Sequence, residues 1–192
     1  MKQKNNYRCE GFTLVELMTV LGILAIFTGV TGYYFLNWLP KYRLKSAAID
    51  MFSNFQMARM KAIKNGCRYA VVFNTEANKY QIVGSGEDGV FSEVSGSDDD
   101  RHGRLVDLLD YGSGVAFGHG NASRNATTTG SDHFPSDGVS YAGNTSEFNS
   151  RGMANKMGYV YLKNNAGNAY AVSTPTMAGV VTLKRWDGSE WQ

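Results

Sequence analysis

The order of apolar and polar residues divides the chain into a long helical part and a part made of strands. From Phe12 to Leu39 almost every residue is apolar or small, and Glu16 carries the only formal charge. Beyond Pro40, apolar residues recur every three or four positions, as one face of an amphipathic helix requires. These residues are Leu44, Ala47, Ala48, Met51, Phe52, Phe55, Ala58, Ala62 and Ile63. Asn65-Gly66 then supplies a helix stop.

The pattern therefore predicts one helix over residues 12–65. Pro40 is its weak point, because proline lacks the amide donor of the helical hydrogen bond. From Arg68 the apolar residues alternate with a period of two, and RYAVVFN (68–74) and KYQIV (79–83) predict a hairpin. Further strands are predicted at residues 104–109, 114–117, 138–141, 146–150, 158–162, 169–173 and 179–185. The apolar stripe of the helix must pack on a sheet made by these strands, which gives an α+β fold.

Two segments between the predicted strands are long loops. Residues 84–103 carry Ser, Gly and the run Asp98-Asp99-Asp100, and residues 118–137 are rich in Gly, Asn, Thr and Ser. Loops of this length in a compact domain are functional or disordered, and the sequence leaves open which applies here.

The first apolar segment predicts a membrane contact. Residues 17–36 would span about 30 Å as a helix, which is the thickness of one hydrocarbon core. A signal peptide would need small residues at a cleavage site behind the segment, and Val30-Thr31-Gly32 fits poorly. A plain anchor would not need Glu16, since a carboxylate in hydrocarbon is costly and requires a partner. A cut after Gly11 would create an α-amine at Phe12, which is the obvious partner.

The charge distribution does not determine the orientation of the apolar segment in a membrane, but it argues against DNA binding. Three basic residues precede the apolar segment and three follow it at 41–45, so the positive-inside rule is near a tie. The formal net charge of the whole chain is +2, and residues 1–11 account for all of it. A chain cut after Gly11 is then near neutral, which disfavours a strongly basic DNA-binding domain.

The start of the chain resembles the type IV prepilins. The resemblance is carried by a basic leader, Gly11-Phe12-Thr13-Leu14-Val15-Glu16-Leu17 and the apolar helix behind it. It implies that a prepilin peptidase cuts between Gly11 and Phe12 and methylates the new Phe12 amine. It also implies that Glu16 neutralises the Phe12 amine of an adjacent subunit during filament assembly. A cytoplasmic leader and a periplasmic head follow from the same resemblance.

The remainder is similar to the GspH/FimT subgroup of minor pilins and pseudopilins. The matching blocks are Ala58–Ile63, Ala70–Phe73, Phe148–Gly152 and Gly179–Leu183. The resemblance implies a head of antiparallel sheets packed on the second half of the helix, and a place at a filament tip or in a priming complex. Some members bind DNA through a Gly-Arg-x-Arg motif, but the matching site here is Gly179-Val180-Val181-Thr182, without either arginine.

Cysteine and histidine give little indication of catalysis. Cys9 would leave with the leader, and Cys67 would then have no disulfide partner; we expect it to be a buried, inert thiol at the start of a strand. His102, His119 and His133 fall in polar stretches without metal-ligand spacing, and we expect them to lie on the surface.

Other candidate sites are equally weak. The run 98–100 lacks the ligand spacing of a calcium loop, so a solvated acidic loop is expected. Three Asn-x-Ser/Thr sequences, at 121, 125 and 144, are expected to be chance matches in Asn-rich loops. Trp186 and Trp191 could belong to the core or to a subunit contact, and the sequence leaves both open.

The expected organisation has four parts: a prepilin leader at 1–11, a transmembrane assembly helix at 12–39, an amphipathic helix at 40–66 and a β-rich head at 67–192. The expected partners are other pilin or pseudopilin subunits, prepilin peptidase and the inner membrane. We expect no cofactor, no metal and no enzymatic activity, and nucleic acid is the alternative partner. Neither a type IV pilus nor a type II secretion system is favoured over the other.

Overall fold

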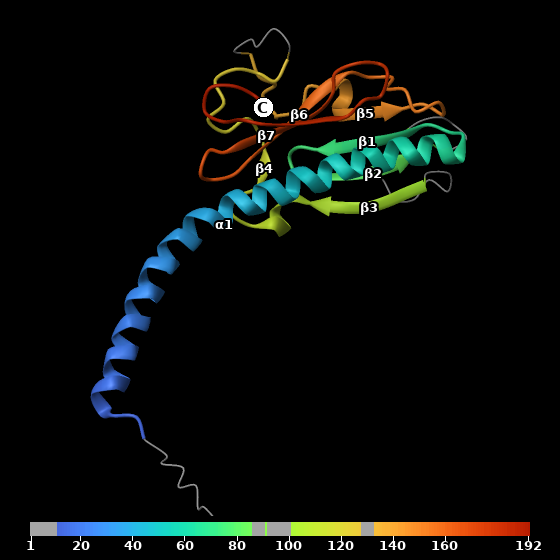
Figure 1. The fold of residues 1–192 in the computed structure, drawn as a ribbon. Coiled ribbons are helices and arrows are strands. Elements are labelled where there is room, and N and C mark those ends of the chain that lie inside the picture. The colour runs from blue at the N-terminus through green and yellow to red at the C-terminus, as the bar shows by residue number, and fades with distance from the viewer. Residues whose placement is uncertain (1–10, 86–90, 92–100, 128–132) are drawn as a thin grey trace, which may run out of the picture. The chain divides into compact units, whose positions relative to one another are not determined.

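The computed structural model describes residues 11–85, 91, 101–127 and 133–192 (Figure 1). The chain forms two compact units, Met1–Leu39 and Pro40–Gln192. The α+β fold class is confirmed, because one long helix, α1 (Leu14–Asn65), is followed by strands that form only antiparallel pairs among the described residues.

The strands form two sheets. The first has the order β3-β2-β1-β5, and its strands are β3 (Arg101–Asp107), β2 (Lys79–Gly84), β1 (Tyr69–Asn74) and β5 (Thr145–Phe148). The second has the order β4-β6-β7-β8, and its strands are β4 (Ala116–Phe117), β6 (Gly158–Lys163), β7 (Ala169–Thr174) and β8 (Thr182–Arg185). Two short 3-10 helices, η1 (Leu108–Tyr111) and η2 (Ala142–Asn144), complete the elements.

The first unit holds the helical residues up to Leu39. Most of its described large apolar side chains are exposed within the chain, such as Leu14 at 73%, Val20 at 49% and Trp38 at 53%. Among the described residues, no helix combines the length and the apolar character needed to cross a membrane. The membrane span expected at residues 12–39 therefore stays a prediction.

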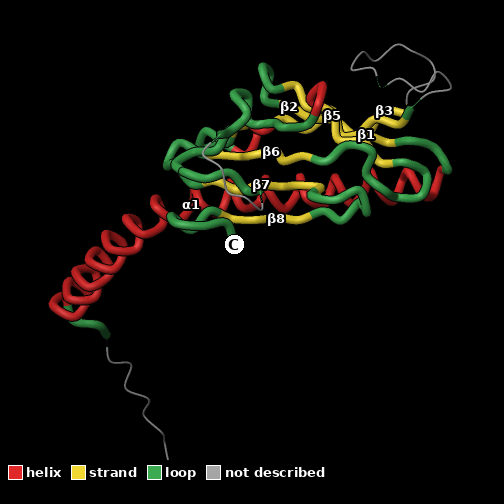
Figure 2. Tube along the Cα trace, turned by 90° about the horizontal axis from the view of Figure 1, so that it is seen from above, coloured by secondary structure: helices red, strands yellow, loops and turns green. Residues whose placement is uncertain are grey.

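In the second unit, one face of α1 is fully buried against both sheets. The residues of this face are Leu44, Ala47, Ala48, Met51, Phe55, Ala58 and Ala62, each with 0% exposure. They share one core with Val71 and Phe73 of β1 and with Val160 and Leu162 of β6. Figure 2 shows β6, β7 and β8 side by side along this part of the helix. The helical period of the sequence thus predicted the buried face correctly.

Pro40 lies inside α1, and the boundary between the two units falls directly before it. The helix assignment is continuous through this residue. The carbonyl of Pro40 accepts a hydrogen bond from Asn164 Nδ2 at 3.0 Å, which fixes the start of the second unit's helix to the turn before β7.

Every predicted strand but one overlaps an observed strand; two predictions are wrong in part and one is wrong. Leu108 and Leu109 are not in a strand but in η1, because the Asp107 side chain accepts a bond from Leu109 N and caps this turn. Residues 138–141 form no strand; Val139 only bridges to Val160. Residues 179–181 precede β8, and Gly179 has a φ of +72°, which interrupts extended backbone.

The two predicted long loops differ in how much is described. Most of 84–103, with the run 98–100, lies outside the described residues. Residues 118–137 are described apart from 128–132, and the described part contains no helix or strand.

Candidate functional site

The candidate site at the start of the chain is built around the first turn of α1. Thr13 precedes the helix, and its Oγ1 accepts a hydrogen bond from Glu16 N at 3.2 Å. The Thr13 carbonyl accepts from Leu17 N, also at 3.2 Å. Thr13 was not among the predicted site residues, although a threonine followed three residues later by glutamate is the sequence signature of a helix N-terminus.

Glu16 lies exposed in the first turn of α1, where a negative charge interacts favourably with the helix dipole. Its carboxylate makes no hydrogen bond or ion pair with the part of the chain that the structure describes. The flanking side chains, including Phe12 at 85% exposure, are apolar and exposed. The charge of Glu16 therefore has no partner within the described chain.

Gly11 lies before the helix, and a Cβ atom added to it would meet nothing within 4 Å. Packing in the described chain therefore does not require a glycine here. Residues 1–10, which include Cys9 and the basic leader, lie outside the described residues.

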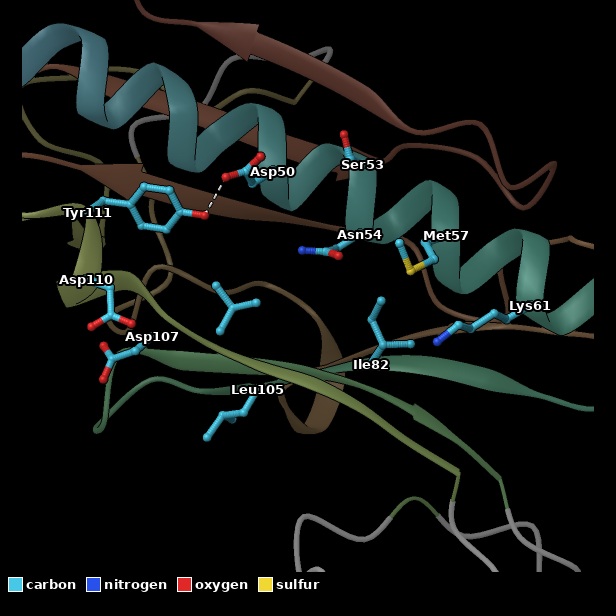
Figure 3. A pocket seen from close by; sticks show the side chains of 11 residues that line it. Asp50, Ser53, Asn54, Met57, Lys61, Ile82, Leu105, Asp107, Asp110 and Tyr111 are labelled. Atoms are coloured by element: carbon cyan, nitrogen blue, oxygen red, sulfur yellow. Dashed lines mark hydrogen bonds between the residues drawn. The ribbon is translucent and has the colours of Figure 1, made fainter.

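A second candidate site is a cavity of the head, of about 520 Å³, between α1 and β2, β3 and η1 (Figure 3). Tyr111 donates a hydrogen bond to Asp50 Oδ2 at 2.6 Å across its mouth. Lys79 pairs with Asp107 at 3.2 Å. The pKa of Asp107 is lowered, chiefly by the bond from the Leu109 backbone amide and also by Lys79. Asp50 and Asp107 therefore each have a partner, while Lys61 and Asp110 also line the cavity.

Metal chemistry finds no support in the described segments, where no three His, Cys, Asp or Glu side chains are placed to hold a metal ion. His133 is exposed as expected, but the surface prediction is wrong for His119. That ring is half-buried and stacks on Phe134 with centroids 4.0 Å apart, and its Nδ1 is buried without a hydrogen bond. No local pattern in the sequence indicated this contact, because it joins two parts of a loop. The side chain of His102 is not described.

Cys67 is a free, half-buried cysteine at a bend, two residues before β1, so the prediction that it begins a strand is wrong. It packs against the main core but is only partly buried, and its inertness stays a prediction.

Both C-terminal tryptophans pack within the head, Trp186 buried and Trp191 partly exposed. Trp186 is 9% exposed and its ring lies 5.4 Å from that of Trp191. Trp191 Nε1 donates to the Arg124 carbonyl at 2.6 Å, and its ring contacts Tyr161. Burial raises the pKa of Tyr161 to about 12. This aromatic cluster anchors the loop before residue 128 to the second sheet.

Residues 6–32 match the prokaryotic N-terminal methylation motif. The matched range contains Gly11, Phe12 and Glu16, so it confirms that the chain begins as prepilin-like proteins do. No curated protein matches the chain.

Two solved structures of the minor pseudopilin EpsH from the type II secretion system of Vibrio cholerae are similar to the chain. The first has 11% sequence identity and a TM-score of 0.47, and covers 73% of this chain and 95% of its own. The second has 14% identity and a TM-score of 0.47, and covers 74% of this chain and 94% of its own. Both are minor pseudopilins, the class that the sequence of the head resembles. The fold assignment itself rests on the helix and strands of this chain.

Proposed function

We propose that the chain is a structural subunit of a type IV pilus or of a type II secretion pseudopilus, as a minor pilin or minor pseudopilin. Cleavage after Gly11 releases Phe12 as the new N-terminus, which is then methylated. The apolar helix holds the subunit in the inner membrane with its head in the periplasm, and then packs with other subunits at the filament tip or in a priming complex.

The match of residues 6–32 to the methylation motif carries this proposal. Two features of the described residues support it. Gly11 is not required by packing, so recognition by a processing enzyme is the better reason for a glycine there. Glu16 has no charge partner in the described chain, and the Phe12 amine of a neighbouring subunit would provide one in a low-dielectric filament core.

Processing is tested by Gly11→Val in the full chain. We expect the intact mass of the variant to keep residues 1–11, whereas wild type loses them. Gly22→Ala is the matched control, since a Cβ at Gly22 also meets nothing within 4 Å. A Gly11→Val protein with the wild-type mature mass would exclude the proposed processing.

Assembly is tested by Glu16→Gln. Glutamine suits the third position of a capped helix as well as glutamate does, so the helix start is retained and only the charge is lost. We expect normal processing but poor recovery of the variant in sheared filaments. Recovery at the wild-type level would contradict the pairing of Glu16 with Phe12.

A clean deletion distinguishes the two machines. Loss of surface pili with normal protein release would indicate a minor pilin, and trapped exoproteins with normal pili would indicate a secretion pseudopilin.

DNA capture is the alternative function. The site that matches the arginine motif has Val180 exposed at 50% and Val181 buried at 6%, so it offers no cation for phosphate.

A further inference from the structure

An exposed apolar surface lies where the end of α1 meets two loops of the head. We call it the methionine patch and define it by Met60, Ile63, Met153, Met177 and Val180. Each of these side chains is between 40% and 62% exposed. Single exposed apolar residues are ordinary, but several that gather on one surface mark an interaction site. Methionine is also enriched at interfaces, because its flexible thioether adapts to a partner.

Contacts between the three segments show that they lie directly against one another. Arg59 Nε on α1 donates to the Gly152 carbonyl at 2.9 Å. A Cβ at Gly152 would lie 2.6 Å from Ile63 Cδ1, so this loop lies directly on the helix. Ala154 N donates to the Met177 carbonyl at 3.0 Å, which joins the second loop to the first. Gly179 packs against the Gly152 carbonyl and Arg59. The patch is therefore formed by the fold, which brings together segments that are far apart in the sequence.

The three segments that form the patch carry charges of one sign, and Glu147, which contacts Asn155, is buried and paired with Arg68. Segments 56–66, 149–157 and 174–183 contain no aspartate or glutamate. They contain five basic residues, which are Arg59, Lys61, Lys64, Arg151 and Lys156. Lys64 and Arg151 are exposed, and neither forms an ion pair within the described residues. An apolar centre with a basic border is complementary to an apolar surface bordered by carboxylates.

We infer that the methionine patch docks a different pilin-like subunit of the same filament, through an apolar contact edged by aspartate or glutamate. This inference rests on the proposed function. A second copy of the chain would bring the same basic border against itself, and like charges across an interface are unfavourable. Nucleic acid would require cations at the centre of the surface, where the structure places methionine, isoleucine and valine.

The test uses the full chain in cells that assemble the filament. The photo-cross-linker p-benzoylphenylalanine replaces Met60 or Met177 in separate variants. Leu109 on η1, which is 57% exposed against 60% for Met177, is the control position. We expect cross-links from positions 60 and 177 to another chain that begins with a methylation motif, and none to that chain from position 109. Peptide mapping should locate the cross-linked site beside aspartate or glutamate residues.

The basic border is tested in the same strains with Lys64→Glu combined with Arg151→Glu. We expect the yield of cross-link to fall by roughly fivefold or more, as the loss of two complementary charge contacts predicts. The control is Lys45→Glu, at an exposed lysine of α1 outside the three segments, which should leave the yield unchanged.

Cross-links to a second copy of the chain would overturn the inference, and so would the absence of any cross-link from a chain that is present in sheared filaments. An unchanged cross-link yield after the charge reversal at Lys64 and Arg151 would also overturn it. Salt-sensitive binding of a DNA duplex that Lys64→Glu abolishes would show that the patch binds nucleic acid instead. The presence of the wild-type chain in the filament fraction is measured separately from cross-linking. If the chain is absent from that fraction, the proposed function fails, and the inference that rests on it fails too.

Discussion

Tyr141 joins the helix and both sheets of the head, and its hydroxyl group should measurably stabilise the fold. The ring lies 6.1 Å from Phe55 of α1 and 6.0 Å from Phe73 of β1. The hydroxyl oxygen accepts a bond from Thr174 N and lies 2.9 Å from Thr174 Oγ1, at the end of β7. Tyr141→Phe keeps the ring and removes only the oxygen.

The free-energy change follows from the hydrogen bonds that the substitution removes. Thr174 Oγ1 keeps its bond to the Lys156 carbonyl, but the amide of the fully buried Thr174 loses its bond to the Tyr141 hydroxyl. The net contribution of such a hydrogen bond is about 0.5–1.5 kcal/mol. We therefore expect the free energy of unfolding to fall by about 1 kcal/mol and the Tm by about 2–4 °C for a chain of this size.

The assay is urea and thermal unfolding of the full-length protein, with Tyr159→Phe as control. Tyr159 lies in β6 and is half-buried, and no side-chain hydrogen bond restrains its hydroxyl among the described residues. That variant should stay within about 0.5 kcal/mol of wild type. Equal stability of the two variants would refute the role of the Tyr141 hydroxyl.

An alkaline titration gives an independent check. Burial raises the pKa of Tyr141 to about 12, whereas an exposed tyrosine ionises near 10. The folded state therefore holds this proton more tightly than the unfolded state, so stability should fall as pH rises from about 10 through about 12. In unfolding experiments at high pH, Tyr141→Phe should lose less stability than the wild type does. In difference spectra of tyrosinate, the ionisation of this tyrosine should be missing from the variant.

Two further substitutions test local features of the head. Gly152→Ala should destabilise it more than Gly143→Ala, because both residues have positive φ but only Gly152 would place a Cβ within 2.6 Å of Ile63; equal Tm values would contradict the clash. Asp107→Asn should lower stability at neutral pH, because the pKa of Asp107 is lowered, first by the Leu109 amide. That difference should disappear as pH falls through the lowered pKa, and a difference that persists in acid would exclude the charge as its cause.

The sequence predicted the parts of the fold that depend on local periodicity. The buried face of α1 follows from apolar residues every three or four positions, and the hairpin of β1 and β2 follows from alternation around residues 75–78. It failed at 138–141 because the alternation there was mistaken for a strand. Tyr141 is instead held by a side-chain bond to Thr174, 33 residues away, which no local pattern encodes.

Sites formed by contacts between distant segments were not predictable for the same reason. The methionine patch requires the loop at 152 to meet Ile63 and the loop at 177 to meet Ala154. In the sequence these residues are scattered single apolar positions without a shared period. Only the absence of acidic residues from the three segments was visible, and it has no meaning until the fold brings the segments together.

Gly11 and Gly152 show why the N-terminal site, unlike the surfaces of the head, could be proposed from sequence. Gly152 has a φ of +76° and close neighbours, so the folded head itself requires a glycine there. Gly11 has neither, and the carboxylate of Glu16 has no partner among the described residues. A residue that its own fold does not require, placed beside a charge that its own fold does not satisfy, points to recognition by other molecules. Such recognition acts on a short linear segment, so its signature is contiguous in sequence, whereas the surfaces of the head become visible only in three dimensions.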